Sequence, residues 1–138
     1  MKVVLDTNVI LSALLFGGKP RRVLEAATAG RVTMFISESL LLELEGVLRR
    51  EKFGLEARVV GAIVAELTAA AEVVEPTVHV SIITDDPSDN DVLDCALAAK
   101  VDYIVSGDRH LLVLGRCGDT QILNTDDFLR QLDEQKES

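Results

Sequence analysis

The chain has 138 residues, of which 48% are hydrophobic, and its formal net charge is -9. This size and apolar content suit one domain with a real core, so we expect a single domain over residues 1–138 with a charged C-terminal tail from about 133. The acidic balance excludes a basic surface that holds nucleic acid by neutralising phosphates, so cations would have to attract such a substrate. No stretch approaches the roughly 18 apolar residues of a membrane span, and no secretory-signal layout is visible, which predicts a cytoplasmic protein with no membrane partner.

The two cysteines match neither a disulfide framework nor the paired spacing of a zinc site. Cys95 lies in an Ala/Leu-rich helical pattern and is predicted to be a small core residue. Cys117 lies in a segment flanked by glycines and is expected in a loop.

Strands and helices alternate through the first half of the chain. Lys2 to Leu5 is a short apolar run that stops at Asp6, and the apolar series 9–15 that follows predicts a helix. Pro20 is expected at the first position of the next helix, which Gly30 ends. The remaining elements of this half are a strand at 32–36, a helix capped by Ser37, a helix at about 55–71 and a short strand at 73–74.

The second half continues the alternation after a segment, residues 77–87, that reads as either strand or loop. A helix is predicted from Ser88, with Asp91 three residues later as in a capping box, and residues 103–105 read as a buried strand. A strand at about 121–123 precedes Asn124, which is expected to cap a last helix whose charged end beyond Leu132 frays. Such alternation implies right-handed crossovers and a mainly parallel sheet covered on both faces, a three-layer α/β/α sandwich.

Acidic residues are expected to meet at one edge of this sheet. Asp6 and Asp108 both follow a predicted strand, and in an open parallel sheet the ligand site lies outside the carboxyl ends of the strands. The segment 85–91 brings four more acids to the start of a helix, where most of them are explained by favourable interaction with the helix dipole. Asp89 differs, because the residues three, four and seven positions later are apolar, which directs its carboxylate inward, where it needs a partner such as a metal.

A further acid is expected from the helix after Ser37, where Glu43 and Glu45 are each flanked by leucine or valine on a helical wheel. Periodicity does not choose between them. Carboxylates without His or Cys ligands favour Mg²⁺ or Mn²⁺, and His79 and His110 are interpreted as ordinary surface or loop residues. In such a site one cation lowers the pKa of water and another stabilises the leaving oxygen, which favours phosphoryl hydrolysis.

Four motifs, in order and spacing, resemble PIN domains, and within that family the toxin group of prokaryotic toxin–antitoxin modules, the VapC-like ribonucleases. The motifs are Val3-Val4-Leu5-Asp6-Thr7-Asn8-Val9, the Ser37…Glu43-Leu44 helix, Asp86-Pro87-Ser88-Asp89-Asn90, and Tyr103-Ile104-Val105-Ser106-Gly107-Asp108-Arg109-His110-Leu111-Leu112.

The resemblance implies a metal-dependent endoribonuclease whose catalytic and metal-binding acids are Asp6, Glu43, Asp89 and Asp108. It implies Asn8 and Ser106 as polar supports, and it favours Glu43 over Glu45 because Leu44 and Leu48 follow Glu43 in the family's pattern. A two-residue shift of the alignment puts Asp91 in the place of Asp89. The resemblance also implies a homodimer, an RNA substrate and inhibition by a small antitoxin.

Other functions remain to be weighed against this one. A haloacid-dehalogenase-like phosphatase needs a second Asp where this chain has Asn8, and a receiver-like domain needs an acidic pair at the first strand, where this chain has Asp6-Thr7. A PIN-like module that only binds RNA or protein would be expected to lack part of the acidic set. Two basic groups, Lys19-Arg21-Arg22 and Arg49-Arg50-Lys52, are each candidates for RNA phosphates or for solvated helix ends.

Overall fold

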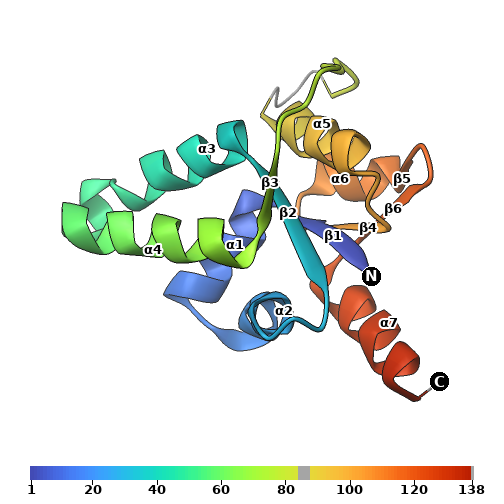
Figure 1. Ribbon diagram of the computed structural model, residues 1–138, viewed down its shortest axis with the longest axis horizontal. Coiled ribbons are helices and arrows are strands. Elements are labelled where there is room, and N and C mark those ends of the chain that lie inside the picture. The colour runs from blue at the N-terminus through green and yellow to red at the C-terminus, as the bar shows by residue number, and fades with distance from the viewer. Residues whose placement is uncertain (84–87, 138) are drawn as a thin grey trace.

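The computed structural model describes residues 1–83 and 88–137, and in this part of the chain the centre is a six-stranded sheet (Figure 1). Its order is β3-β2-β1-β4-β6-β5, and all neighbours are parallel except β5, which runs antiparallel to β6. The strands are β1 (Lys2–Leu5), β2 (Thr33–Ser37), β3 (Glu72–Val74), β4 (Tyr103–Val105), β5 (Arg116–Cys117) and β6 (Thr120–Leu123).

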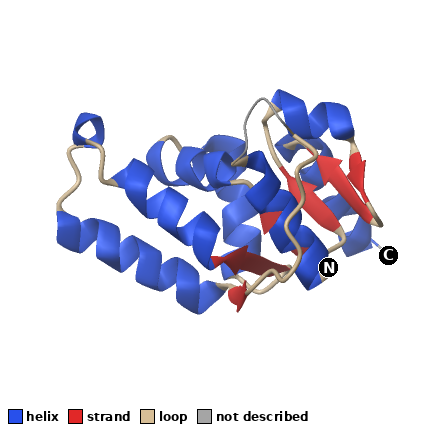
Figure 2. Cartoon of the chain, turned by 90° about the horizontal axis from the view of Figure 1, so that it is seen from above, coloured by secondary structure: helices blue, strands red, loops and turns tan. Residues whose placement is uncertain are grey.

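Helices cover both faces of the sheet, which confirms the predicted three-layer α/β/α sandwich. The helices are α1 (Thr7–Leu15), α2 (Gly18–Thr28), α3 (Glu38–Leu48), α4 (Ala57–Ala70), α5 (Asp89–Ala99), α6 (Arg109–Leu114) and α7 (Thr125–Glu137), with a 3₁₀ turn η1 (Glu51–Phe53). Helix α5 packs across β1 to β4 on one face, while α1, α2 and α7 pack together on the other (Figure 1). Helices α3 and α4 form an arm that extends away from the sheet (Figure 2).

The central position of β1 follows from its sequence. Val3, Val4 and Leu5 are all buried, as an uninterrupted apolar run requires when both faces of a parallel strand are covered. Val4 pairs in register with Phe35 of β2 on one side and Ile104 of β4 on the other. The residue after β1, Asp6, is thereby brought beside the end of β4.

Two predicted helix caps are confirmed. The Ser37 hydroxyl accepts a hydrogen bond from the Leu40 amide at 3.3 Å, and the Asn124 side chain accepts one from the Asp127 amide at 2.8 Å. Each satisfies an amide that the first turn of a helix leaves without an internal partner. The sequence therefore located the starts of α3 and α7 correctly.

Two other helix ends differ from the prediction. Helix α2 begins at Gly18, so Pro20 is its third residue; the first turn needs no internal amide partner and tolerates proline there. Helix α7 continues to Glu137 instead of fraying after Leu132. An ion pair between Arg130 and Asp127 at 3.3 Å supports its exposed side, and the buried Leu132 anchors the other.

Helix α6 and strand β5 were not anticipated, and Cys117 lies in β5 rather than in a loop. Cys117 is buried, and Cys95 is fully buried as predicted. Burial raises the pKa of the Cys95 thiol to about 12, so this thiol is held as a neutral core group. None of the described helices has the length and apolar character that crossing a membrane requires.

Candidate active site

A buried hydroxyl joins two acids at the carboxyl ends of β1 and β4. Ser106 donates from Oγ to Asp6 Oδ2 at 2.7 Å, and the same Oγ accepts a hydrogen bond from the Asp108 amide at 2.9 Å. Ser106 is completely buried and its backbone continues the pairing of β4 with β6. The pairing of the strands thus brings together residues that lie 100 positions apart in the chain.

Asp6 is held in one orientation from both carboxylate oxygens. Besides the bond from Ser106, its Oδ1 accepts from the Asn8 amide at 3.3 Å and from the Thr7 hydroxyl at 3.5 Å. Burial raises the pKa of Asp6 above its usual value; the bonds from Ser106 and Asn8 oppose this shift, and the negative charge of Asp108 adds to it. Asp6 is therefore a desolvated carboxylate that faces a second carboxylate.

Asp108 caps α6 and is half-buried. Its Oδ1 accepts from the His110 amide at 2.7 Å and from the Leu111 amide at 3.4 Å. Its Oδ2 accepts no hydrogen bond from the residues that the structure describes. Asp6 caps α1 in a similar way, so both acids stand at the first turn of a helix.

Glu43 and Glu45, between which periodicity could not choose, are both half-buried on α3. Glu45 Oε1 accepts from Arg49 Nε at 3.0 Å and lies 2.8 Å from its Nη2, an ion pair along one side of α3. This i,i+4 ion pair accounts for an acidic residue at position 45 without a metal. Glu43 is half-buried on the same helix, which packs against α1 and α5.

Asp89 and Asp91 also have different surroundings. Asp89 is the first residue of α5 and is only 5% exposed, as its inward direction predicted. Asp91 is half-buried; burial raises its pKa, and the charge of Asp94 raises it further. The side chain of Ser88 does not cap α5, so the expected capping box with Asp91 is absent. Asp85 and Asp86 lie outside the described residues.

Two side chains of α5 hold the preceding segment of chain in place. Asn90 donates from Nδ2 to the Ile83 carbonyl at 2.7 Å and accepts from the Ile83 amide at 3.0 Å, as a neighbouring strand would. One turn later, the buried Asp94 accepts from the Val80 amide at 2.7 Å and lies 3.0 Å from Nδ1 of the exposed His79. Residues 79–83 are therefore fixed along α5, close in sequence to its start at Asp89.

The fit of a divalent cation to these residues rests on the pair Asp6 and Asp108. Their oxygens suit a hard cation, and a positive ion between them would relieve both the burial and the mutual repulsion of the two charges. Within the described residues, no three Asp, Glu, His or Cys side chains are gathered closely enough to hold a metal ion. The expected convergence is thus seen for Asp6 and Asp108 and not for a full set with Glu43 and Asp89.

Sequence reasoning missed part of what surrounds the acids. Thr7 is buried with its hydroxyl on Asp6, and its position directly after the acid is the signal that could have identified it. Asn8 supports Asp6 through its backbone amide, while its side chain is exposed and lines a hollow beside Asp108. Ser106 was expected as a polar support, and its hydroxyl bridges the two acids.

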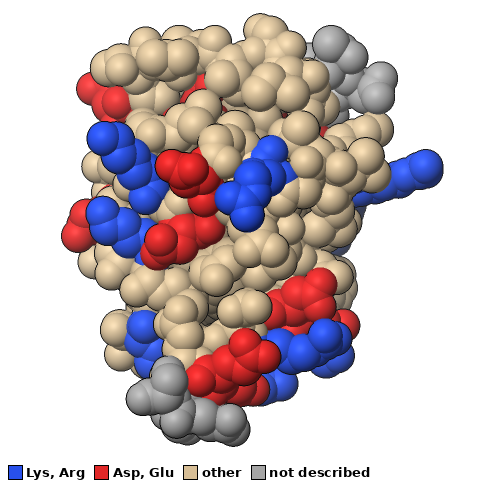
Figure 3. All heavy atoms as spheres, turned by 90° about the vertical axis from the view of Figure 1, so that its right-hand side faces the viewer, with Lys and Arg blue, Asp and Glu red and all other residues tan. Residues whose placement is uncertain are grey.

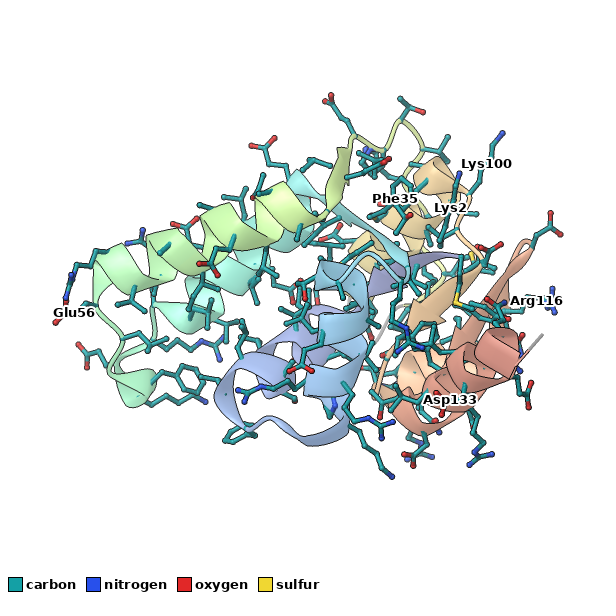
Figure 4. The ribbon with its side chains drawn as sticks, turned by 60° about the horizontal axis from the view of Figure 1, so that its bottom comes forward. Lys2, Phe35, Glu56, Lys100, Arg116 and Asp133 are labelled. Carbon is teal, nitrogen blue, oxygen red and sulfur yellow. The ribbon has the colours of Figure 1, made fainter. Side chains whose placement is uncertain are left out.

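Charges of both signs are mixed on the surface. On the face shown in Figure 3, Lys and Arg side chains are interspersed with Asp and Glu. Arg49 and Lys52 belong to the outer end of the α3–α4 arm, where Figure 4 labels Glu56. Lys19 lies at the start of α2 and pairs with Asp126 of α7 at 2.5 Å. At the opposite end of the molecule, Lys2 lies over the ring of Phe35 at 5.6 Å from its centroid (Figure 4).

Comparison with known proteins agrees with this fold. The model of the PIN domain family matches residues 2–110, and the chain belongs to this family. Uncharacterized protein MJ1680 of Methanocaldococcus jannaschii is 28% identical over 119 residues, which are 83% of this chain and 75% of that protein.

Two solved structures share the fold at 17% sequence identity. VapBC2 from Rickettsia felis, bound to a DNA fragment from their promoter, has a chain that superposes with a TM-score of 0.62, over 90% of this chain and 98% of that one. VapBC-1 from nontypeable Haemophilus influenzae gives a TM-score of 0.61 over 91% of this chain and 99% of that one. The α/β/α arrangement is therefore the fold of these two structures, and the family match assigns it to a PIN domain.

Proposed function

We propose that this PIN domain is a Mg²⁺- or Mn²⁺-dependent endoribonuclease that hydrolyses RNA phosphodiester bonds. The observation that carries the proposal is the Asp6–Ser106–Asp108 arrangement at the carboxyl ends of adjacent parallel strands, in which the Ser106 hydroxyl bonds the Asp6 carboxylate and the Asp108 amide, and the Asp108 charge raises the pKa of Asp6. Buried carboxylates without nearby thiolate ligands favour a hard cation over zinc or copper.

Each residue has a defined part in this proposal. Asp6 and Asp108 would hold the cation. Ser106 fixes the orientation of Asp6 by donating to its carboxylate, and its Oγ accepts a hydrogen bond from the Asp108 amide. Glu43 on α3 and Asp89 on α5 complete the acidic set from helices that contact each other. A divalent cation bound there polarises the phosphodiester and lowers the pKa of water.

The biological setting follows from the toxin group that the four motifs resemble. The likeness in fold to two VapBC structures supports a toxin that pairs with an antitoxin. Action on RNA in the cytoplasm is proposed on the resemblance of the motifs alone. A homodimer is proposed on the same resemblance. Growth arrest on expression, relieved by co-expression of an antitoxin encoded beside the chain, supports this setting; unimpaired growth contradicts it.

The activity is tested with purified protein and a fluorescently labelled single-stranded RNA. We expect cleavage in Mg²⁺ or Mn²⁺, no cleavage in excess EDTA, and nearly complete loss of cleavage in Asp6→Asn. Glu45→Gln is the matched control, since it removes an acid that is already paired with Arg49. Cleavage by Asp6→Asn at the wild-type rate, or undiminished cleavage in EDTA, would refute the metal mechanism.

A further inference from the structure

A hollow of about 410 Å³ opens beside Asp108. It lies between α1, the start of α2, the turn after β4 and the start of α7. Its walls include Asn8 and Ser12, one turn apart on α1, together with Pro20, Gly107 and Thr125. Its volume falls in the range of roughly 300–1,000 Å³ typical of small-molecule sites.

The chemistry of the walls suits a nucleoside better than a phosphate. Asn8 contributes an amide and Ser12 and Thr125 contribute hydroxyls, so the polar groups are uncharged donors and acceptors. Val9 and Pro20 add apolar surface, and none of the described residues that line the hollow is a Lys or an Arg. Sugar hydroxyls and base edges are recognised by such neutral groups, whereas phosphates are met by cations.

Gly107 is an exposed residue that lines the hollow next to Asp108. A Cβ placed at Gly107 would meet no atom within 4 Å, so the space in front of this residue is not filled by protein. Gly107 stands between Ser106, which bonds Asp6, and Asp108. A nucleoside in the hollow would consequently lie against Gly107 and Asp108, next in the chain to Ser106, which bonds Asp6.

One of the two basic groups adjoins the hollow. Pro20 lies between Lys19 and Arg21 in the chain, and Thr125 precedes Asp126, with which Lys19 is paired. Lys19 and Asp126 are both about half exposed, so a phosphate could compete with Asp126 for Lys19. Arg49, Arg50 and Lys52 belong instead to the outer part of the α3–α4 arm (Figure 4).

We propose that this hollow binds the nucleoside next to the cleaved bond, with Asn8, Ser12 and Thr125 hydrogen-bonding its sugar or base. Lys19 then meets the following phosphate, so the RNA strand runs from Asp6 and Asp108 toward the start of α2. This inference deepens the proposed ribonuclease function and depends on it.

The test compares Ser12→Leu, which fills the hollow, with Thr68→Leu, which makes a similar change on the exposed side of α4. Cleavage of labelled single-stranded RNA is measured for both, and RNA affinity is measured in an Asp6→Asn background with Mg²⁺ present. We expect Ser12→Leu to weaken affinity and cleavage about tenfold, equivalent to 1.4 kcal/mol, and Thr68→Leu to match the parent.

Thr125→Val and Lys19→Ala keep the inference testable if Ser12→Leu does not fold. Thr125→Val, which removes only a hydroxyl, is expected to weaken affinity about threefold, in keeping with the loss of one hydrogen bond. Lys19→Ala is expected to reduce the slope of log affinity against log salt by about 0.7, the value for one phosphate on a single strand.

The two levels of the proposal fail differently. A wild-type chain that cleaves RNA while the hollow variants bind and cleave like the parent would overturn the nucleoside site alone. A folded wild-type chain that cleaves no RNA in either metal would overturn the ribonuclease function, and the nucleoside site with it.

Discussion

Ser106 donates its hydroxyl proton to Asp6 at 2.7 Å from the adjacent strand, and this bond fixes the orientation of the most deeply buried acid of the candidate site. The same oxygen accepts a hydrogen bond from the Asp108 amide at 2.9 Å. One hydroxyl therefore couples the conformations of two acids that come from opposite ends of the chain. Several expected outcomes derive from this arrangement.

Replacing Asp6 with Asn is expected to leave the fold at least as stable as the wild type at pH 7. The folded-state pKa of Asp6 is raised, chiefly by burial, so its charged form opposes folding. As pH falls toward 3.8, wild-type Asp6 takes up its proton in the folded state first, and the advantage of Asp6→Asn shrinks. Urea unfolding of both proteins between pH 4 and 8 measures this difference; a stability gap that widens toward acid pH contradicts it.

Replacing Ser106 with Ala is expected to lower cleavage roughly 10- to 100-fold, as for other residues that orient metal ligands. The Ser106 bond lowers the pKa of Asp6, so its loss raises that pKa further and moves the acid limb of the pH–rate profile to higher pH. The free energy of unfolding should fall by about 1–3 kcal/mol, because a buried acceptor loses its donor. Ser106→Thr, which retains the hydroxyl, is the control and should keep the acid limb in place.

The choice between Glu43 and Glu45 can be measured directly. Glu43→Gln is expected to reduce cleavage at least about 100-fold if Glu43 completes the acidic set. Glu45→Gln should leave cleavage unchanged and lower stability by about 0.5 kcal/mol or less, since it removes only a surface pair with Arg49. Cleavage assays and urea titrations of the two variants, run in parallel, distinguish the two acids. A larger loss of cleavage in Glu45→Gln than in Glu43→Gln would place Glu45 in the acidic set.

Asp89→Asn and Asp91→Asn form a second matched pair. Asp89 is nearly fully buried, and its replacement is expected to lower cleavage at least about 100-fold. Asp91 stands near Asp94, whose charge raises the pKa of Asp91, so Asp91→Asn relieves a repulsion and should keep both stability and cleavage. If Asp91→Asn proves the more damaging change, the alignment of the third acid must shift by two residues.

Asn90→Ala is expected to destabilise the fold by about 2 kcal/mol or more, because the amide and the carbonyl of Ile83 both lose their partner. Asn90→Asp keeps the acceptor and loses the donor, so its free energy of unfolding should lie between those of Asn90→Ala and the wild type. Urea unfolding gives the energies, and hydrogen exchange at the Ile83 amide reports the local opening. An unchanged exchange rate in Asn90→Ala would show that Asn90 does not hold this segment.

Most of the fold was predictable because its elements carry strong local signals. The apolar run of β1, the Ser37 cap and the Asn124 cap each fixed an element from a few neighbouring residues. Helix α6 and strand β5 are only six and two residues long, too short for a periodic pattern to stand out. Residues 77–83 remained ambiguous because their backbone partners are side chains of α5, which periodicity does not reveal.

The candidate site was predictable to the extent that sheet topology determines it. Asp6 and Asp108 follow parallel strands, and β1 and β4 are neighbours, so their proximity follows from the fold. The Glu45–Arg49 pair has the i,i+4 spacing of a helix and could have been read from the sequence, whereas the packing of α3 against α1 and α5 is known only from the structure. The hollow beside Asp108 is formed by four separate elements, and no single segment of sequence carries its signal.

The adjacency of β1 and β4 also determines when the candidate site can form. Ser106, which bonds Asp6, lies 100 positions after it in the chain. The site can therefore assemble only after these two strands have paired, and a fragment that lacks either strand cannot form it.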